Sequence, residues 1–190
     1  MDERFTRLFS LPENLGLDGC PIVISAGVLL KDNATRNILV QLKLRNLSPQ
    51  EIKAVQVKIN AYDITGAVLE GVNTFSYLDL SVPLDGDFGS QTPIWLPDAT
   101  ARSFTVDVLS VTLVDGTVYV PAEGQVTRMV TGDVREKITE LDAKRAVQAR
   151  WELLKQVLHI LLILLGILLC CGAAISIIQF MIYVNRTIWR

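Results

Sequence analysis

The sequence predicts a mainly β protein: an immunoglobulin-like antiparallel β-sandwich, then a long C-terminal helix that continues into one transmembrane helix. Three observations favour this fold. Residues 20–130 alternate apolar and polar side chains with the period of two typical of strands. Residues 133–156 lack Pro and Gly and are rich in helix-forming residues, and residues 160–178 carry no charge. The expected boundaries are an N-terminal extension at 1–19, the sandwich at 20–130, a helical stalk at 131–156, a transmembrane helix at 157–184 and a short tail at 185–190.

The composition limits the classes of function. The formal net charge is −2, and no basic cluster of the kind that binds nucleic acid is present in the sequence. Cys20 is the single cysteine of the predicted sandwich, so a disulfide scaffold is not expected, and the absence of a C-x-x-C motif excludes a zinc ribbon. The first ten residues, MDERFTRLFS, mix acids and bases, so no signal peptide is expected there.

The strand prediction rests on three alternating runs. We expect the inward-facing side chains to be Val40, Leu42 and Leu44 in the first run, Val55, Val57, Ile59 and Ala61 in the second, and Phe104, Val106 and Val108 in the third. In the third run the alternation changes phase near Ser110, which leaves either Val111 or Leu113 facing inward. Asp115-Gly116 is the clearest hairpin turn. About seven strands in about 110 residues fit a sandwich.

One stretch resembles a known family. Residues 42–71 read LKLRNLSPQEIKAVQVKINAYDITGAVLEG, which resembles the core hairpin of small Ig-like modules of the FxLYD type. The block from CPIVISAGVLLKDN to PDATARSFTVDV is similar to uncharacterised Ig-like membrane proteins of anaerobic Gram-positive bacteria. Some of those relatives carry a zinc ribbon that this sequence lacks. The resemblance implies the fold and assigns no catalytic residue.

The apolar run at 160–178 matches the ~20 residues that cross a bilayer. The membrane-interface residues expected at its two ends are Trp151, Lys155, Tyr183, Arg186 and Trp189. Four basic residues on the N-terminal side against two on the other favour a tail-anchored protein of the cell membrane with its sandwich in the cytoplasm. The lipid bilayer is then the first expected partner.

Small residues repeat every four positions inside this run, at Gly166, Cys170 and Ala174. Such a face permits helix-helix contact and a weak homodimer, although an ordinary single span is the simpler reading. Val147, Trp151, Leu154, Leu158 and Leu161 follow a 4-3-4-3 spacing in the sequence. That spacing is compatible with a short coiled-coil stalk or with a helix that rests on headgroups.

No set of residues predicts catalysis, a cofactor or a metal. His159 is the only histidine and lies outside the sandwich, so no triad is expected. Asp85-Gly86-Asp87 resembles a fragment of a calcium loop but is better explained as a solvated turn. Cys20 is expected to pack rather than react. A modest basic surface is expected on one wet sheet face, from Lys43, Arg45, Lys53 and Lys58.

The expected function is a non-enzymatic, single-pass membrane-anchored interaction module at the cytoplasmic membrane surface, with an unidentified protein partner. Residues 78–80 and 93–95 are the expected sheet edges for binding an extended segment, with Trp95 more easily explained as a core residue. The alternative is an externally facing cell-envelope domain with a structural or adhesive role.

Overall fold

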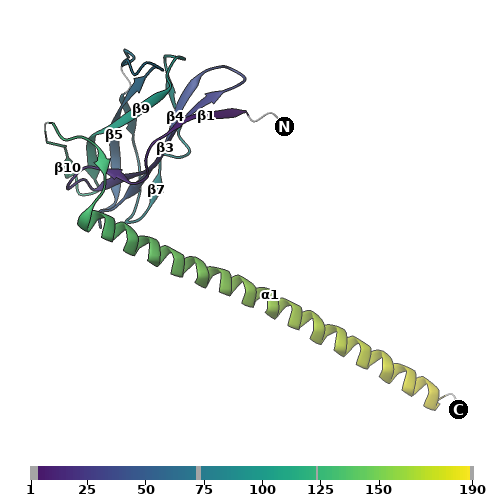
Figure 1. The fold of residues 1–190 in the computed structure, drawn as a ribbon. Helices are drawn as coiled ribbons and strands as arrows, with labels where there is room; N and C mark the ends of the chain where they lie inside the picture. Colours follow the sequence, from purple (N-terminus) through teal and green to yellow (C-terminus); the bar gives the residue numbers. More distant parts are fainter. Residues whose placement is uncertain (1–3, 72–73, 123, 189–190) are drawn as a thin grey trace. The chain divides into compact units, whose positions relative to one another are not determined.

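The computed structural model describes residues 4–71, 74–122 and 124–188; the side chains of 168–174, 184 and 186–188 lie outside the description. The chain divides into two compact units, Met1–Ile138 and Thr139–Arg190. The first unit holds two antiparallel sheets, and the second is helical (Figure 1). A mainly β fold with two sheets and a C-terminal helix is therefore confirmed.

The larger sheet, sheet A, has seven strands in the order β11-β2-β3-β4-β7, with β1 on β3 and β8 on β4. Its strands are β1 (Phe5–Ser10), β2 (Leu15–Gly16), β3 (Ile22–Asp32), β4 (Ile38–Asn46), β7 (Asp87–Phe88), β8 (Ile94–Leu96) and β11 (Arg128–Met129). Sheet B has the order β10-β9-β5-β6, and its strands are β5 (Ile52–Tyr62), β6 (Thr74–Tyr77), β9 (Ser103–Leu113) and β10 (Val118–Tyr119). Residues before position 20, set apart above as an extension, thus supply two strands of sheet A.

The core lies between the two sheets, as the period-two pattern predicts. All the inward-facing side chains expected on β4, β5 and β9 are buried. The phase change on β9 is also present: Gln56 pairs with Ser110 while Val57 pairs with Val108, so one extra residue forms a bulge. Beyond the bulge Val111 is buried and Leu113 only partly so, which decides between the two alternatives.

Two glycines, Gly116 and Gly27, shape the backbone near the candidate site. Gly116 has a φ of 85°, and its N–H donates to the Leu113 carbonyl in the tight turn that joins β9 to β10. On β3, a Cβ added to Gly27 would lie 2.6 Å from Leu11 Cδ1. A glycine is therefore what lets the chain after β1 lie directly on sheet A.

α1 (Gly132–Ile188) is a single helix of 57 residues. Nowhere in the described part of the chain does a helix combine the length and the apolar character needed to cross a membrane. The predicted transmembrane helix, and the tail-anchored membrane assignment built on it, is wrong.

Candidate functional site

A groove of about 520 Å³ lies along β9 and is lined by residues of both sheets. We call it the β9 groove. Its lining comes from β1 and the loop after it, from β2, β5 and β9, and from the segment before β11: Phe9, Leu11, Pro12, Leu15, Asn60, Tyr62, Phe104, Thr105, Val106, Asp107, Val126 and Thr127. The volume is in the range of pockets that bind ligands.

The floor of the groove is apolar and joins the two sheets. Phe104 and Val106 on β9 are buried core residues. Phe9 on β1 meets Phe104 edge-to-face, with ring centroids 5.8 Å apart and an interplanar angle of 76°. Leu11 and Leu15 complete this surface and pack against the same core. The floor is therefore fixed by core packing and is formed without a ligand.

The rim of the groove is polar and lies on the outer face of sheet B. Asn60 on β5 is paired with Thr105 on β9. Asn60 Nδ2 donates to Asp107 Oδ2 at 2.8 Å and makes a longer contact of 3.4 Å with Thr105 Oγ1. The Tyr62 hydroxyl lies 3.4 Å from the same Thr105 oxygen. These four side chains form a row of polar contacts across two strands. The Asn60–Asp107 hydrogen bond has the shortest donor–acceptor distance of the row.

Part of β9 has a free edge. β9 pairs with β5 along its whole length, but β10 pairs only with Val111 and Thr112. Within the described ranges, residues 103–110 therefore have a strand neighbour on one side only. Alternate main-chain N–H and C=O groups of a strand point to each side, so this half of β9 presents unpaired groups to the groove.

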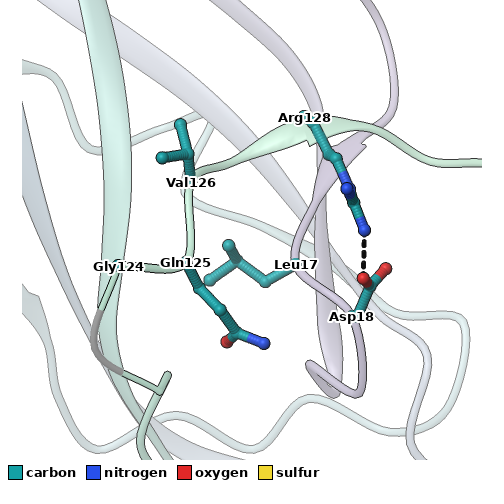
Figure 2. Close-up of a pocket in the computed structure, with 6 residues that line it drawn as sticks. All are labelled: Leu17, Asp18, Gly124, Gln125, Val126 and Arg128. Atoms are coloured by element: carbon teal, nitrogen blue, oxygen red, sulfur yellow. Dashed lines mark hydrogen bonds and ion pairs between the residues drawn. The ribbon is translucent and has the colours of Figure 1, made fainter.

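The far wall of the groove is Val126 and Thr127, just before β11. β11 is attached to β2 by the pairs Arg128–Gly16 and Met129–Leu15. Figure 2 shows the Arg128 side chain directed at the Asp18 carboxylate, to which it is ion-paired. Both side chains are about 70% exposed (68% and 71%), so this ion pair adds little to stability and the strand pairing holds the wall.

A second hollow of about 370 Å³ shares Val126 with the β9 groove. Its lining, drawn in Figure 2, is Leu17, Asp18, Gly124, Gln125, Val126 and Arg128. The two charges in it neutralise each other, and Gln125 Oε1 accepts from the Ala122 N–H. The charged side chains of this hollow and Gln125 Oε1 therefore already have partners within the chain, so we do not treat it as the candidate site.

Two polar groups of the groove have unused hydrogen-bonding capacity. The Thr127 hydroxyl is buried and has no hydrogen-bond partner in the described structure. Asp107 is the only charged residue among the described lining residues, and the one hydrogen bond described for its carboxylate comes from Asn60. A carboxylate has capacity for several donors, so Asp107 can accept more from a ligand.

Of the residues expected at a membrane interface, the structure describes the side chains of Trp151, Lys155 and Tyr183. Trp151 and Lys155 are exposed on α1, where Lys155 Nζ pairs with Glu152 Oε1 at 2.7 Å; Tyr183 is exposed as well. The side chain of Arg186 and all of Trp189 lie outside the described residues. In the stripe expected to support helix-helix contact, Gly166 is described and has no neighbouring atom within contact distance of an added Cβ, while the side chains of Cys170 and Ala174 are outside the description.

The structure also places His159 and the Asp85-Gly86-Asp87 turn. His159 is exposed on α1. The Asp85-Gly86-Asp87 turn is not simply solvated, because Asp85 Oδ1 accepts from Arg45 Nε at 2.5 Å and Asp87 pairs with Lys43 at 3.1 Å. The described portion of the chain has no group of three or more acidic, His or Cys side chains that could hold a metal ion.

The predicted basic surface is wrong. Arg45 is buried, with 4% of its surface exposed, and Lys43 is ion-paired on sheet A. Lys53 and Lys58 belong to β5 in sheet B. The four side chains therefore do not share a face, since their two strands lie in different sheets.

Cys20 is partly buried and packs against the core. Burial raises the pKa of its thiol to about 11, with a smaller opposing effect from the Ile22 N–H. The thiol is therefore protonated near neutral pH, which agrees with a packing role.

Of the two sheet edges favoured by the sequence, residues 78–80 follow β6 and are not part of a strand, whereas 93–95 overlap β8; both neighbouring strands are poor binding edges. β6 has four residues, and β8 has three that are flanked by Pro93 and Pro97, which lack an N–H. Trp95 on β8 is 51% exposed, so its interpretation as a core residue is wrong. Ile94 and Leu96 on either side of it are buried, so the alternation along β8 places Trp95 on the outer face of sheet A.

The β9 groove was missed in the sequence, although a signal for it exists. Pro121 follows closely after the Asp115-Gly116 turn. A proline ends regular pairing, so the return strand of this hairpin is expected to be short and to leave the first half of β9 without its hairpin partner.

Comparisons with known proteins do not assign this chain to a family. No family model matches the chain, and none of the curated proteins or solved structures gives a match. The resemblance to FxLYD-type modules stays a prediction.

Proposed function

We propose that this chain is a non-enzymatic interaction module whose β9 groove binds an extended segment of a protein partner by strand addition. The observation that carries the proposal is the unpaired edge of residues 103–110 beside a preformed apolar floor. An extended peptide that adds to a sheet edge gains main-chain hydrogen bonds, and the pockets beside the edge select its side chains.

The chemistry of this edge supports binding rather than protection. Natural edge strands are usually shielded by Lys, Pro or very short length. Residues 103–110 read SFTVDVLS, with neither Lys nor Pro. Their one charge is Asp107, and the bulge lies at the far end, between Val108 and Ser110, so residues 103–108 are regular. At ~3.3 Å per residue this edge accepts a strand of about 26 Å. Neither β6 nor β8 offers such a length.

The floor explains why a partner would gain free energy from entering the groove. A strand added beside β9 continues sheet B, so its inward side chains lie over Phe9, Leu11 and Leu15 of the opposite part of the sandwich. Each apolar side chain buried there contributes roughly 1.5–3 kcal/mol before the cost of ordering the peptide. The buried Thr127 hydroxyl would gain the partner that it lacks in the described structure.

Hydrogen-exchange mass spectrometry of the full chain tests this function. The probe is a synthetic eight-residue peptide of alternating Thr and Val, which is uncharged and readily extended. We expect the peptide to slow amide exchange in residues 103–110 and to leave β6 and β8 unchanged. Unchanged exchange in 103–110 at saturating peptide would overturn the proposal.

A matched pair of exposed valines provides the mutational control. Val126 is 72% exposed and forms the groove wall, whereas Val118 is 53% exposed on β10, outside the described groove lining. Val126→Asp places a charge in the groove and should weaken binding of the Thr/Val peptide about tenfold, the size of effect expected when a charge must be desolvated. The Val118→Asp variant should bind the Thr/Val peptide as tightly as the unchanged chain does. An equal loss of affinity in both variants would contradict binding in the β9 groove.

A further inference from the structure

Side chains of opposite character alternate along the free edge of β9. Phe104, Val106 and Val108 face the core, while Thr105 and Asp107 face outward. A strand that pairs with β9 must place its own side chains with the same period of two. The groove therefore selects a sequence pattern in addition to an extended shape.

We propose that the segment bound in the β9 groove alternates apolar and basic residues, with a Lys or Arg opposite Asp107. This proposal rests on the proposed strand addition and names the class of partner sequence. The apolar residues lie opposite Phe104, Val106 and Val108, and those opposite Phe104 and Val106 enter the floor of the groove. A polar residue lies opposite Thr105.

The register of sheet B gives the reason for a basic residue. Asp107 is directly opposite Lys58 on β5, and Thr105 is directly opposite Asn60. A cation from the added strand on the other side of Asp107 completes a row of alternating charge across three strands. Opposite charges on facing positions stabilise a sheet, and like charges destabilise it.

The geometry of the rim also favours a cation over an anion. Asp107 is the sole charged group in the described lining, so no fixed positive charge in the groove can pair with an acidic ligand. Thr105 lies on the same outer face of β9 as Asp107, and its hydroxyl is 3.4 Å from the Tyr62 hydroxyl. A carboxylate and neighbouring hydroxyl oxygens can accept hydrogen bonds from an ammonium or a guanidinium group.

Three synthetic octapeptides test the inference at low ionic strength with the full chain: alternating Lys/Val, alternating Thr/Val and alternating Glu/Val. We expect Lys/Val to bind about tenfold tighter than Glu/Val, because a facing carboxylate is repelled by Asp107. Asp107→Asn keeps an oxygen for the Asn60 donor and should reduce this ratio to about twofold. Asp107→Lys should reverse the order of the two charged peptides.

Asp79→Asn is the matched control for overall charge. Asp79 has a φ of 53°, which Asn tolerates, and it lies outside the described groove lining. Its variant should keep the tenfold ratio. If Asp107→Asn leaves the ratio unchanged while Thr/Val still slows exchange in 103–110, the basic pattern is wrong and strand addition stands. If none of the three peptides slows exchange there, strand addition itself is wrong.

Discussion

Phe9 on β1 and Phe104 on β9 meet edge-to-face at 5.8 Å between ring centroids, across the boundary between sheet A and sheet B. This contact joins the two sheets at the floor of the β9 groove. The groove therefore depends on the same packing that stabilises the sandwich, and its formation can be tested through stability.

Phe9→Leu should lower the free energy of unfolding by about 1–2 kcal/mol, since it removes the aromatic contact and leaves part of the volume unfilled. Chemical denaturation measures the change. Phe5→Leu is the control, because Phe5 is on the same strand but outside the core cluster. Equal losses in the two variants would contradict a special role for the Phe9–Phe104 contact.

Gly27→Ala should cost about 1 kcal/mol of stability, because its Cβ would meet Leu11 Cδ1 at 2.6 Å and force that side chain out of place. A double variant with Leu11→Ala removes the clash, so the two changes should be non-additive. Simple additivity in a double-mutant cycle would show that the glycine is not needed for this approach.

Asp85→Asn should destabilise the sandwich by about 3 kcal/mol. Asn fits the φ of 67° at this position, so the loss reports the ion pair with the buried Arg45 rather than the turn. Asp87→Asn breaks the more exposed pair with Lys43 and should cost less than about 1 kcal/mol. Similar values for the two variants would contradict the difference in burial.

The free energy of unfolding should decrease in acid as carboxylates that accept hydrogen bonds in turns, such as that of Asp32, become protonated. The Ala34 N–H donates to Asp32, and this bond, followed by smaller contributions from Thr35 and Arg4, lowers the pKa of Asp32 below its usual 3.8 despite opposing desolvation. Because the folded pKa is the lower one, the stabilisation is present above pH 3.8 and is lost as the pH falls through the folded value. Denaturation curves of Asp32→Asn should show a smaller loss between pH 4 and pH 2 (about two pH units); an unchanged acid limb would exclude this contribution.

Cys20 should react slowly with a thiol reagent in the folded chain. Burial raises its pKa to about 11, so less thiolate is present at pH 8 than in the unfolded chain, where the value is 9.0. The same shift makes the free energy of unfolding fall as the pH rises from 9 towards 11. Labelling kinetics in a Cys170→Ser, Cys171→Ser background isolates the residue, and native labelling as fast as in denaturant would refute the burial.

The sequence predicted the elements whose residues alternate regularly and missed those defined by pairing alone. β5 alternates from Val55 to Ala61, and its buried face over these residues was predicted in full; the buried Ile52 lies before a register shift at Ile52/Ala54 and was not predicted. β1 reads FTRLFS, whose apolar residues show no such period, so its place in sheet A depends on pairing with β3. The β9 groove depends on where β10 stops, which is a property of two strands together.

The most direct test of strand addition is an N-methyl scan of the alternating Thr/Val octapeptide against the full chain. An N-methyl group removes one donor and blocks pairing on one side of the peptide only. We expect alternate positions to abolish binding and the positions between them to have little effect, with the sensitive set all on the side that faces β9. Uniform tolerance of N-methylation along the peptide would contradict pairing with residues 103–110 and, with it, the proposed function.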